Sequence, residues 1–192
     1  MKKENYFKKE IEYVEDTKKR EDLVYLIKLL PDYFFEIPAS STNKYHPDYA
    51  STNAGLVKHV KVVTRIAYEL LNNPIYRERF TDSERDLIIM ACVLHDGFKS
   101  GREKERYTRF DHPLIMSEVI MENRNNLSLT TDEVRGLCKM IEAHMGPWNT
   151  NSYSDIVLPK PENERERFVH LCDYLASRKF LNVNFNGIEI KG

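Results

Sequence analysis

Apolar residues recur at helical spacing along most of the chain, at intervals of three and four positions. Residues 4–30 fit one or two helices that end before Pro31, because proline cannot continue a helix. Two later segments begin with the S/T-x-x-E pattern of a capping box, Thr81 with Glu84 and Thr130 with Glu133. The helices predicted after residue 30 cover about 55–72, 82–97, 113–123, 131–145 and 161–181.

Three segments break this helical period. Residues 37–54 are rich in Ser, Thr, Asn and Pro and predict a long loop, and such loops are usually functional or disordered. Residues 98–112 are charged and predict irregular structure. Near the C-terminal end, the Asn-Gly pair that begins at Asn186 separates alternating apolar positions such as Phe185 and Ile188, a strong hairpin signal. The sequence therefore predicts an all-α helical bundle with a small C-terminal β-hairpin.

Four of the predicted helices place a His or an Asp within an apolar stripe. These residues are His59, the adjacent pair His95 and Asp96, His144, and Asp173, which shares its stripe with Val169, Ala176 and Phe180. A lone buried histidine is usually bonded to a backbone carbonyl, and a lone aspartate to a basic partner or a helix end. An unpaired buried carboxylate is costly, however. A shared divalent cation satisfies all of these side chains together, because neutral imidazoles and carboxylates are its natural ligands.

The order of these residues resembles the HD superfamily of metal-dependent phosphohydrolases. The stretch HDGFK, which begins at His95, matches the H-D-x-x-K form of that superfamily. The stretch GLVKH around His59 resembles its first ligand segment, and HLCDYLASRK around Asp173 resembles its last. The resemblance covers about residues 38–180. It implies an HD phosphohydrolase domain over 37–181, with an N-terminal helical segment (1–36) packed on its core and a hairpin tail (182–192).

The resemblance also implies a two-metal subtype. In HD subfamilies with two metals, two further histidines lie between the HD pair and the last aspartate, and His112 and His144 match those positions. By this resemblance Asp96 bridges two ions, His112 and His144 hold the second ion, and the first is completed by His59, His95 and Asp173. For His170, a role in packing or at the surface is expected instead.

Several polar residues are candidate substrate contacts. Lys99, one turn after the HD pair, is expected to offset charge on phosphoryl oxygens. The loop PASSTNKYHP resembles a stretch of some bacterial and phage HD proteins, and solvated loop or helix-end positions are the alternative interpretation of these contacts. The candidate phosphate contacts are Ser40, Ser41, Lys44, Tyr45, His46, Arg178 and Lys179.

The expected reaction is hydrolysis of a phosphoester or phosphoanhydride bond in a nucleotide-type substrate, by attack of metal-bound hydroxide. Asp96 and Lys99 are the expected catalytic residues of this phosphomonoesterase or phosphodiesterase. The ligand types accept one or two ions of Mn, Fe, Co, Ni, Zn or Mg. Two alternatives stay open: a diiron oxygenase built on an HD fold, and a non-catalytic HD module that senses a nucleotide.

Charge and composition limit the kinds of partner that the protein is expected to bind. With 29 Lys and Arg against 30 Asp and Glu, the net charge of -1 argues against a broad nucleic-acid surface. It favours a small nucleotide over long nucleic acid, while the HD resemblance implies a nucleotide, a cyclic nucleotide, a dinucleotide or an oligonucleotide end as the substrate. No apolar run approaches the roughly 20 residues that span a bilayer, the start MKKENYFKKE lacks a signal peptide, and the three cysteines form no CxxC pair. A cytoplasmic protein without a membrane partner is expected, with the hairpin tail as a candidate homo-oligomer contact.

Overall fold

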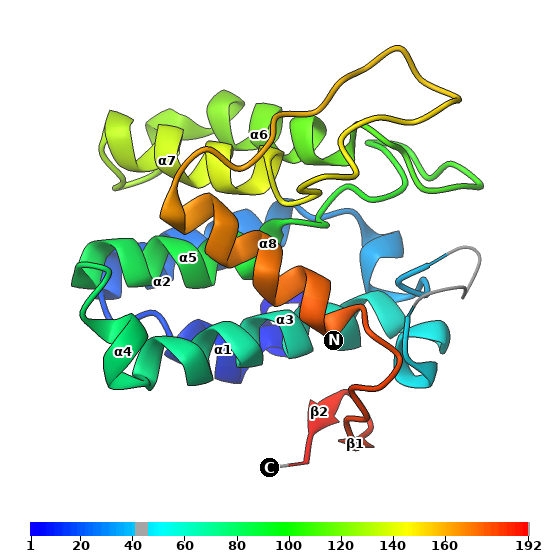
Figure 1. Cartoon of the computed structure of the whole chain (residues 1–192), viewed down its shortest axis with the longest axis horizontal. Coiled ribbons are helices and arrows are strands. Elements are labelled where there is room, and N and C mark those ends of the chain that lie inside the picture. The colour runs from blue at the N-terminus through cyan, green and yellow to red at the C-terminus, as the bar shows by residue number, and fades with distance from the viewer. Residues whose placement is uncertain (41–45, 192) are drawn as a thin grey trace.

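The computed structural model describes residues 1–40 and 46–191, and helices make up most of this part of the chain (Figure 1). The α-helices are α1 (Lys8–Glu12), α2 (Thr17–Leu29), α3 (Gly55–Asn72), α4 (Pro74–Arg77), α5 (Asp82–Leu94), α6 (His112–Glu122), α7 (Thr131–Glu142) and α8 (Glu164–Ala176). Short 3₁₀ segments cover Lys3–Phe7, Asp32–Phe35, Asp48–Ser51 and Arg124–Asn126. The strands are β1 (Phe185–Asn186) and β2 (Glu189–Ile190). The predicted all-α fold with a small C-terminal hairpin is thereby confirmed.

Helix α5 lies at the centre of the packing. Every residue from Leu87 to Leu94 is buried, and a helix that is apolar on all sides is typical of a core. α5 packs against α2, α3 and α7, α6 lies on α7, and α8 runs across α3, α5 and α7 (Figure 1). The C-terminal end of α5 is therefore enclosed by other helices. The two residues that follow it, His95 and Asp96, lie in the interior although they are polar.

The N-terminal segment is joined to this core by apolar contacts and by a buried carboxylate. Leu23, Leu26 and Leu30 are fully buried in the same hydrophobic cluster as α3 and α5. Asp86 on α5 is 3% exposed and accepts hydrogen bonds from the backbone N–H groups of Glu15 (2.7 Å) and Asp16 (3.0 Å). The domain boundaries at residues 36 and 181 stay predictions.

The predicted helix starts are confirmed more closely than the predicted helix ends. Both capping boxes form, at Thr81 and at Thr130. α5 and α7 end a few residues earlier than expected, at Leu94 and Glu142, and α8 runs from Glu164 to Ala176 rather than over 161–181. The charged segment between α5 and α6 is irregular, as predicted.

The placement of Phe180 on the apolar stripe of α8 is wrong. Phe180 lies beyond the helix and is 78% exposed. The helix ends at Ala176, and the hydroxyl group of the next residue, Ser177, donates to the carbonyl oxygen of Tyr174 at 2.8 Å. A serine hydroxyl that binds the last carbonyl groups of a helix offers the backbone an alternative to a further helical turn. The period of the sequence therefore continues past the point where the helix stops.

The hairpin forms, but its register differs from the one expected for an Asn-Gly turn. Asn186 pairs with Glu189, so the two turn residues are Gly187 and Ile188. Ile188 therefore lies in the turn instead of in a strand. Gly187 has φ +61°, and a glycine at the first turn position is the signature of a type II′ hairpin.

A fully buried ammonium group joins the hairpin to the helices. Lys61 on α3 is 0% exposed, and its Nζ donates to Glu10 Oε2 at 3.0 Å and to Glu189 Oε1 at 3.0 Å. Glu10 lies in α1 and Glu189 in β2, so segments near both ends of the chain meet at one residue of α3.

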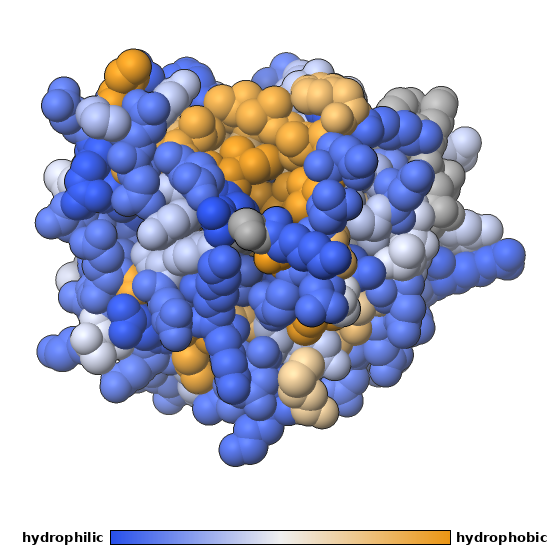
Figure 2. Space-filling model, turned by 90° about the horizontal axis from the view of Figure 1, so that it is seen from below, coloured by the Kyte–Doolittle hydropathy of each residue, from blue (hydrophilic) through white to orange (hydrophobic). Residues whose placement is uncertain are grey.

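One face of the molecule carries an apolar area. Figure 2 shows hydrophobic residues gathered in the upper central part of the face seen from below, with hydrophilic residues beside and below them. The homo-oligomer contact expected from the sequence stays a prediction.

Among the described residues, no helix is both long enough and apolar enough to cross a membrane.

Candidate metal centre

The structure brings together all six residues that the sequence predicts as metal ligands. They come from the N-terminal part of α3 (His59), the turn after α5 (His95 and Asp96), the first turn of α6 (His112), the turn after α7 (His144) and α8 (Asp173). The first five are at most 2% exposed, and the Asp173 side chain is 20% exposed. Because the contributing elements converge on the C-terminal end of α5, the helical packing itself assembles the group.

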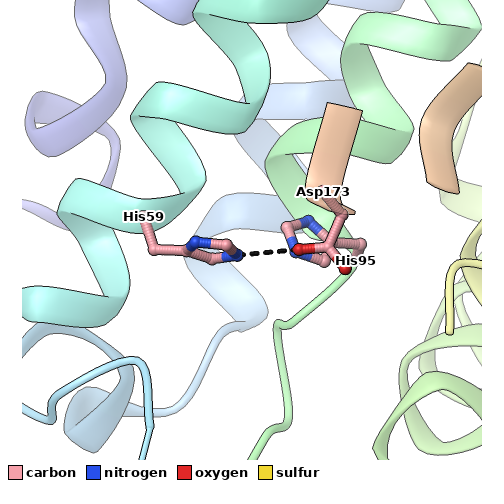
Figure 3. A group of neighbouring side chains, drawn as sticks. All are labelled: His59, His95 and Asp173. Carbon is pink, nitrogen blue, oxygen red and sulfur yellow. Dashed lines mark hydrogen bonds and ion pairs between the residues drawn. The ribbon is translucent and has the colours of Figure 1, made fainter. Parts of the chain in front are cut away.

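The first half of the group consists of His59, His95 and Asp173 (Figure 3). His59 Nε2 lies 2.9 Å from Asp173 Oδ1, and His95 Nε2 lies 3.6 Å from the same oxygen. The ligand atoms of these residues all lie within 4.8 Å of one another, which is close enough to share one ion. This is the first set that the HD resemblance implies.

The second half is built around the carboxylate of Asp96. Asp96 Oδ1 lies 2.9 Å from His112 Nε2 and 3.8 Å from His144 Nε2. Asp96 Oδ2 faces the other way, 3.5 Å from His95 Nε2 and 3.9 Å from His59 Nε2. The two oxygens of one carboxylate therefore face two different sets of imidazoles, as a bridging ligand requires. The ligand atoms of His95, Asp96 and His144 also lie within 4.8 Å of one another, so His95 borders both sets.

Local backbone geometry orients three of the imidazoles. The Nδ1 atoms of His95, His112 and His144 each lie 2.7–2.8 Å from the carbonyl oxygen three residues earlier. A hydrogen bond at Nδ1 fixes the proton there and leaves the lone pair of Nε2 for a metal. Among the described residues, the buried atoms Nε2 of His95, Nε2 of His112 and Oδ1 of Asp96 have no hydrogen-bond partner. Buried polar atoms are nearly always satisfied, so this clustering indicates a ligand site.

The electrostatics of the group favour positive charge at its centre. Burial opposes ionisation of Asp96 and Asp173, but the pKa of each carboxyl group is held well below its usual range, by Lys99 and His95 for Asp96 and by His59 and His95 for Asp173. Burial opposes the charge on His95 as well, yet the two carboxylates raise its pKa to about 10. The carboxylates of Asp96 and Asp173 therefore attract positive charge to the space between them and His95. A proton on His95 supplies this charge, and a metal cation that binds there displaces the proton.

His144 shows the opposite behaviour. Burial, followed by repulsion from His95 and His112, lowers its pKa to about 3. The imidazole is therefore neutral at physiological pH, which is the form that coordinates a metal.

A cavity of about 410 Å³ opens beside the centre. Asp96, His112, His144 and Asp173 form part of its wall, so the ligand atoms are reachable from it. Lys99 also lines the cavity, and its ammonium group forms an ion pair with Asp96 Oδ2. Lys99, which is expected from the sequence to contact the substrate phosphate, therefore lies beside the candidate metal ligands and forms an ion pair with one of their carboxylates.

The other predicted substrate contacts fall into three groups. Ser40, His46 and Arg178 line the same cavity. Lys179 is exposed and does not belong to the cavity wall. Ser41, Lys44 and Tyr45 lie outside the described residues. The geometry is therefore compatible with three of these assignments, and all of them stay predictions.

His46, which the sequence indicates only as a candidate phosphate contact, lies directly beside the candidate metal ligand His59. Its ring meets the ring of His59 edge-on, with 5.1 Å between the centroids. Burial, and then repulsion from His59 and Lys99, lowers the pKa of His46 to about 3. His46 is therefore neutral and offers a hydrogen bond rather than a positive charge.

Sequence reasoning missed two aromatic residues of the cavity wall, Trp148 and Tyr174. Their rings are stacked, with centroids 5.6 Å apart and 9° between the planes. Trp148 belongs to the stretch MGPWN, which signalled only the end of a helix, although it is the single tryptophan of the chain. The sequence does not show that the Trp148 side chain is 52% exposed or that it lines a cavity, because both depend on the folded structure.

The buried imidazoles and carboxylates place this chain among all-helical proteins that have a candidate site for divalent metal ions. Comparison with protein families narrows this class: the chain belongs to the HD domain family, whose model matches residues 56–178. HD domains are metal-dependent hydrolase domains of the phosphohydrolase type, and they bind divalent metals. Comparison with curated proteins and with solved structures gave no match.

Proposed function

We propose that this chain is a phosphohydrolase that uses two divalent metal ions to cleave a phosphoester or phosphoanhydride bond in a nucleotide-type substrate. The observation that supports this proposal most directly is the arrangement around Asp96. Its two carboxylate oxygens face different imidazoles, at 2.9 Å for His112 Nε2 and 3.5 Å for His95 Nε2. A group that only stabilised the fold would place these nitrogen atoms in well-aligned hydrogen bonds, whereas among the described residues neither makes one, although both are buried and lie near the carboxylate.

In this proposal His59, His95 and Asp173 hold one ion, His112 and His144 hold the other, and Asp96 is shared. When bound, a divalent ion lowers the pKa of a coordinated water molecule toward ~7 and so makes a nucleophile available at neutral pH. The residues of the chain supply the orientation: the hydrogen bonds at Nδ1 hold His95, His112 and His144 in the ligating tautomer.

The cavity wall provides groups for the phosphate. Lys99 and Arg178 carry positive charge on this wall, and Ser40 and neutral His46 provide hydrogen-bonding groups there. Charge that develops on phosphoryl oxygens is stabilised when donors are already in place, because they need no reorganisation during the reaction. Lys99 is the group closest to the centre, since it holds Asp96 Oδ2.

Size and charge favour a small substrate. A cavity of about 410 Å³ lies within the range of sites for small molecules and cofactors, roughly 300–1,000 Å³. The net charge of -1 offers no broad attraction for a long polyanion. A nucleotide, or the last nucleotide of a short strand, meets both conditions.

The test is a screen of nucleoside mono-, di- and triphosphates, cyclic nucleotides and dinucleotides with Mn, Fe, Co, Ni, Zn or Mg, followed by identification of the products. Metal-dependent release of phosphate or of a nucleotide supports the proposal and separates phosphomonoesterase from phosphodiesterase activity. Dioxygen consumption without phosphorus–oxygen cleavage contradicts it, as does nucleotide binding without turnover under every metal.

The number of ions has a separate test. His112→Gln removes a ligand of the proposed second ion only, whereas His59→Gln removes a ligand of the first. Metal content measured by mass spectrometry is expected to fall from about two ions per chain to about one in the His112 variant. An unchanged content in that variant contradicts the assignment of His112.

A further inference from the structure

Trp148 and Tyr174 stack on each other in the wall of the cavity that holds the candidate metal centre, and this stacked pair is called the aromatic surface below. Their rings are nearly parallel, at 9°, and their centroids are 5.6 Å apart. Trp148 is 52% exposed. Single exposed aromatic residues are common on proteins. A stacked pair in the same cavity as the catalytic ligands calls for a specific explanation.

The backbone that carries Trp148 is held on both sides. The Trp148 N–H donates to the carbonyl oxygen of Met145 at 3.2 Å. On the other side, Asn149 Nδ2 donates to the carbonyl oxygen of Leu158 at 2.9 Å, and the Leu158 N–H donates to the carbonyl oxygen of Asn149 at 2.9 Å. The indole is therefore exposed on a fixed backbone, and a fixed aromatic ring loses little conformational entropy when a ligand binds to it.

His170 links this surface to the metal ligands. Its Nδ1 lies 2.8 Å from the carbonyl oxygen of His144, and its ring centroid lies 5.9 Å from that of Trp148. The ring packs over Gly146, which has φ +61°, and a Cβ at that position would lie 2.3 Å from His170 Cε1. Glycine is therefore required there, and the short segment from His144 to Trp148 has a defined path. The spacing between the aromatic surface and the candidate centre is set by these contacts.

The charges around the pair match a nucleotide. The Arg178 guanidinium lies 4.3 Å from the centroid of the Tyr174 ring and lines the same cavity. Lys99 lies on the wall next to Asp96. The Tyr174 ring is already in contact with the Trp148 ring and with the Arg178 guanidinium, so the aromatic face left for a ligand is that of the exposed Trp148. Another part of the cavity offers cations and candidate metal ligands. A nucleotide has the same two parts, a flat base with a π-face and a phosphate.

We propose that Trp148, supported by its stack on Tyr174, forms a stacking platform for the nucleobase of the substrate, which places the attached phosphate at the metal centre. This inference rests on the proposed function and specifies its substrate class as one that carries a base. Stacking on aromatic rings tolerates every base, because each base has a π-face. The platform thus selects nucleotides over sugar phosphates without strong preference among the four bases.

The single tryptophan makes the platform directly observable, because the tryptophan fluorescence of the protein comes from Trp148 alone. The full chain is titrated in Mg²⁺ buffer with adenosine 5′-monophosphate, and in parallel with ribose 5-phosphate and inorganic phosphate. Saturable quenching by the nucleotide, with little change from the two base-free probes, is expected. Equal responses to all three probes, or no response to the nucleotide, overturn the proposal.

Variants separate stacking from a general effect on folding. Trp148→Ala is expected to weaken nucleotide binding, measured by calorimetry, roughly tenfold or more, whereas Trp148→Phe keeps a stacking ring and recovers most of the affinity. Tyr153→Ala changes an aromatic residue in the same loop that is 95% exposed and lies outside the cavity wall, so it is the matched control. Equal affinity in the Trp148→Ala variant and the wild type overturns the platform.

The result also separates this inference from the proposed function. If the enzyme hydrolyses nucleotides and ribose 5-phosphate with the same kcat/KM, the phosphohydrolase proposal holds and the platform is wrong. If the nucleotide quenches Trp148 but no metal supports turnover, the platform holds and the proposed function is wrong.

Discussion

Asp96 Oδ1 lies 2.9 Å from His112 Nε2, although the two residues belong to different segments of the fold and both are almost fully buried. The contact joins the turn after α5 to the first turn of α6. It places the central carboxylate within reach of a histidine that local sequence spacing alone does not bring to it. This relationship makes Asp96 the most informative residue to change.

Asp96→Asn keeps the shape of the side chain but removes the charge that two ions would share. We expect metal content per chain to fall at least tenfold, because a neutral amide oxygen is a weaker ligand and its NH₂ group cannot coordinate. Mass spectrometry of the purified, metal-loaded variant measures this. Asp155→Asn, at an exposed position outside the cavity wall, is the matched control and should keep its metal. Full metal content in Asp96→Asn would remove the residue from the ligand set.

Lys99→Gln separates metal binding from phosphate stabilisation. Lys99 pairs with Asp96 but is not itself a ligand, so its loss leaves the carboxylate free to coordinate. We expect metal content to be unchanged and kcat to fall by about 10²-fold, the usual scale for one lost oxyanion donor. The measurement is phosphate release under saturating substrate, with metal content determined on the same sample. A rate equal to that of the wild type contradicts the role of Lys99.

Glu133→Gln tests how acid affects the fold at a site away from the cavity. Burial raises the pKa of Glu133, but hydrogen bonds from Thr130, Lys19 and Ser83 outweigh it and lower the pKa to about 2. A carboxyl group with a lowered folded pKa stabilises the protein above its unfolded pKa and loses that contribution as the pH falls. The wild type should therefore be more stable than Glu133→Gln by ~1–2 kcal/mol at pH 7.

This advantage should disappear as the pH falls from about 4.5, the ordinary value for Glu, toward about 2. Urea denaturation of both proteins at several pH values measures it. Glu162→Gln, at an exposed position before α8, is a control whose stability should follow the wild type. A constant difference between wild type and Glu133→Gln across this range would mean that the carboxylate charge plays no part.

Lys61→Met leaves Glu10 as a buried carboxylate that has lost its ammonium partner. Burial already raises the pKa of Glu10, and Lys61 is the first group that opposes this effect. We expect a loss of ~3–5 kcal/mol in the free energy of unfolding, which is typical when one member of a buried pair is removed. Glu189→Gln should cost ~1 kcal/mol or less, because the Glu189 side chain is 51% exposed.

The double variant Lys61→Met, Glu10→Gln sharpens this test, since no buried charge is left. Its stability should lie well above that of Lys61→Met alone, as measured by the midpoint of urea unfolding. A double variant that is no more stable than Lys61→Met would show that the loss comes from packing.

The six candidate ligands, whose role in metal binding stays a prediction, could be grouped from the sequence because their signal is local. His59 and Asp173 are in phase with apolar residues of their own helices, and helical phasing determines which side chains face the core. The capping boxes at Thr81 and Thr130 are equally local, and both form. These features need only a few neighbouring residues to be recognised.

The features that escaped prediction depend on distant contacts or on single hydrogen bonds. Lys61 lies next to apolar residues in the sequence of α3, and no local pattern predicts that it binds Glu10 and Glu189. Trp148 gains significance only from Tyr174, which lies on another element. At the end of α8 the hydroxyl group of Ser177 binds the carbonyl oxygen of Tyr174, a local contact that the hydrophobic period does not reveal. Periodicity identifies which face of a helix is buried, but not what that face meets.

The separation of the ligands along the chain has a consequence for biosynthesis. His59 and Asp173 meet at 2.9 Å but are 114 positions apart, and the ligands between them lie on three further elements. A nascent chain still on the ribosome holds several imidazoles long before the last carboxylate emerges. A metal ion that needs Asp173 as a ligand would therefore bind only after α8 has been synthesised and has packed on the other helices.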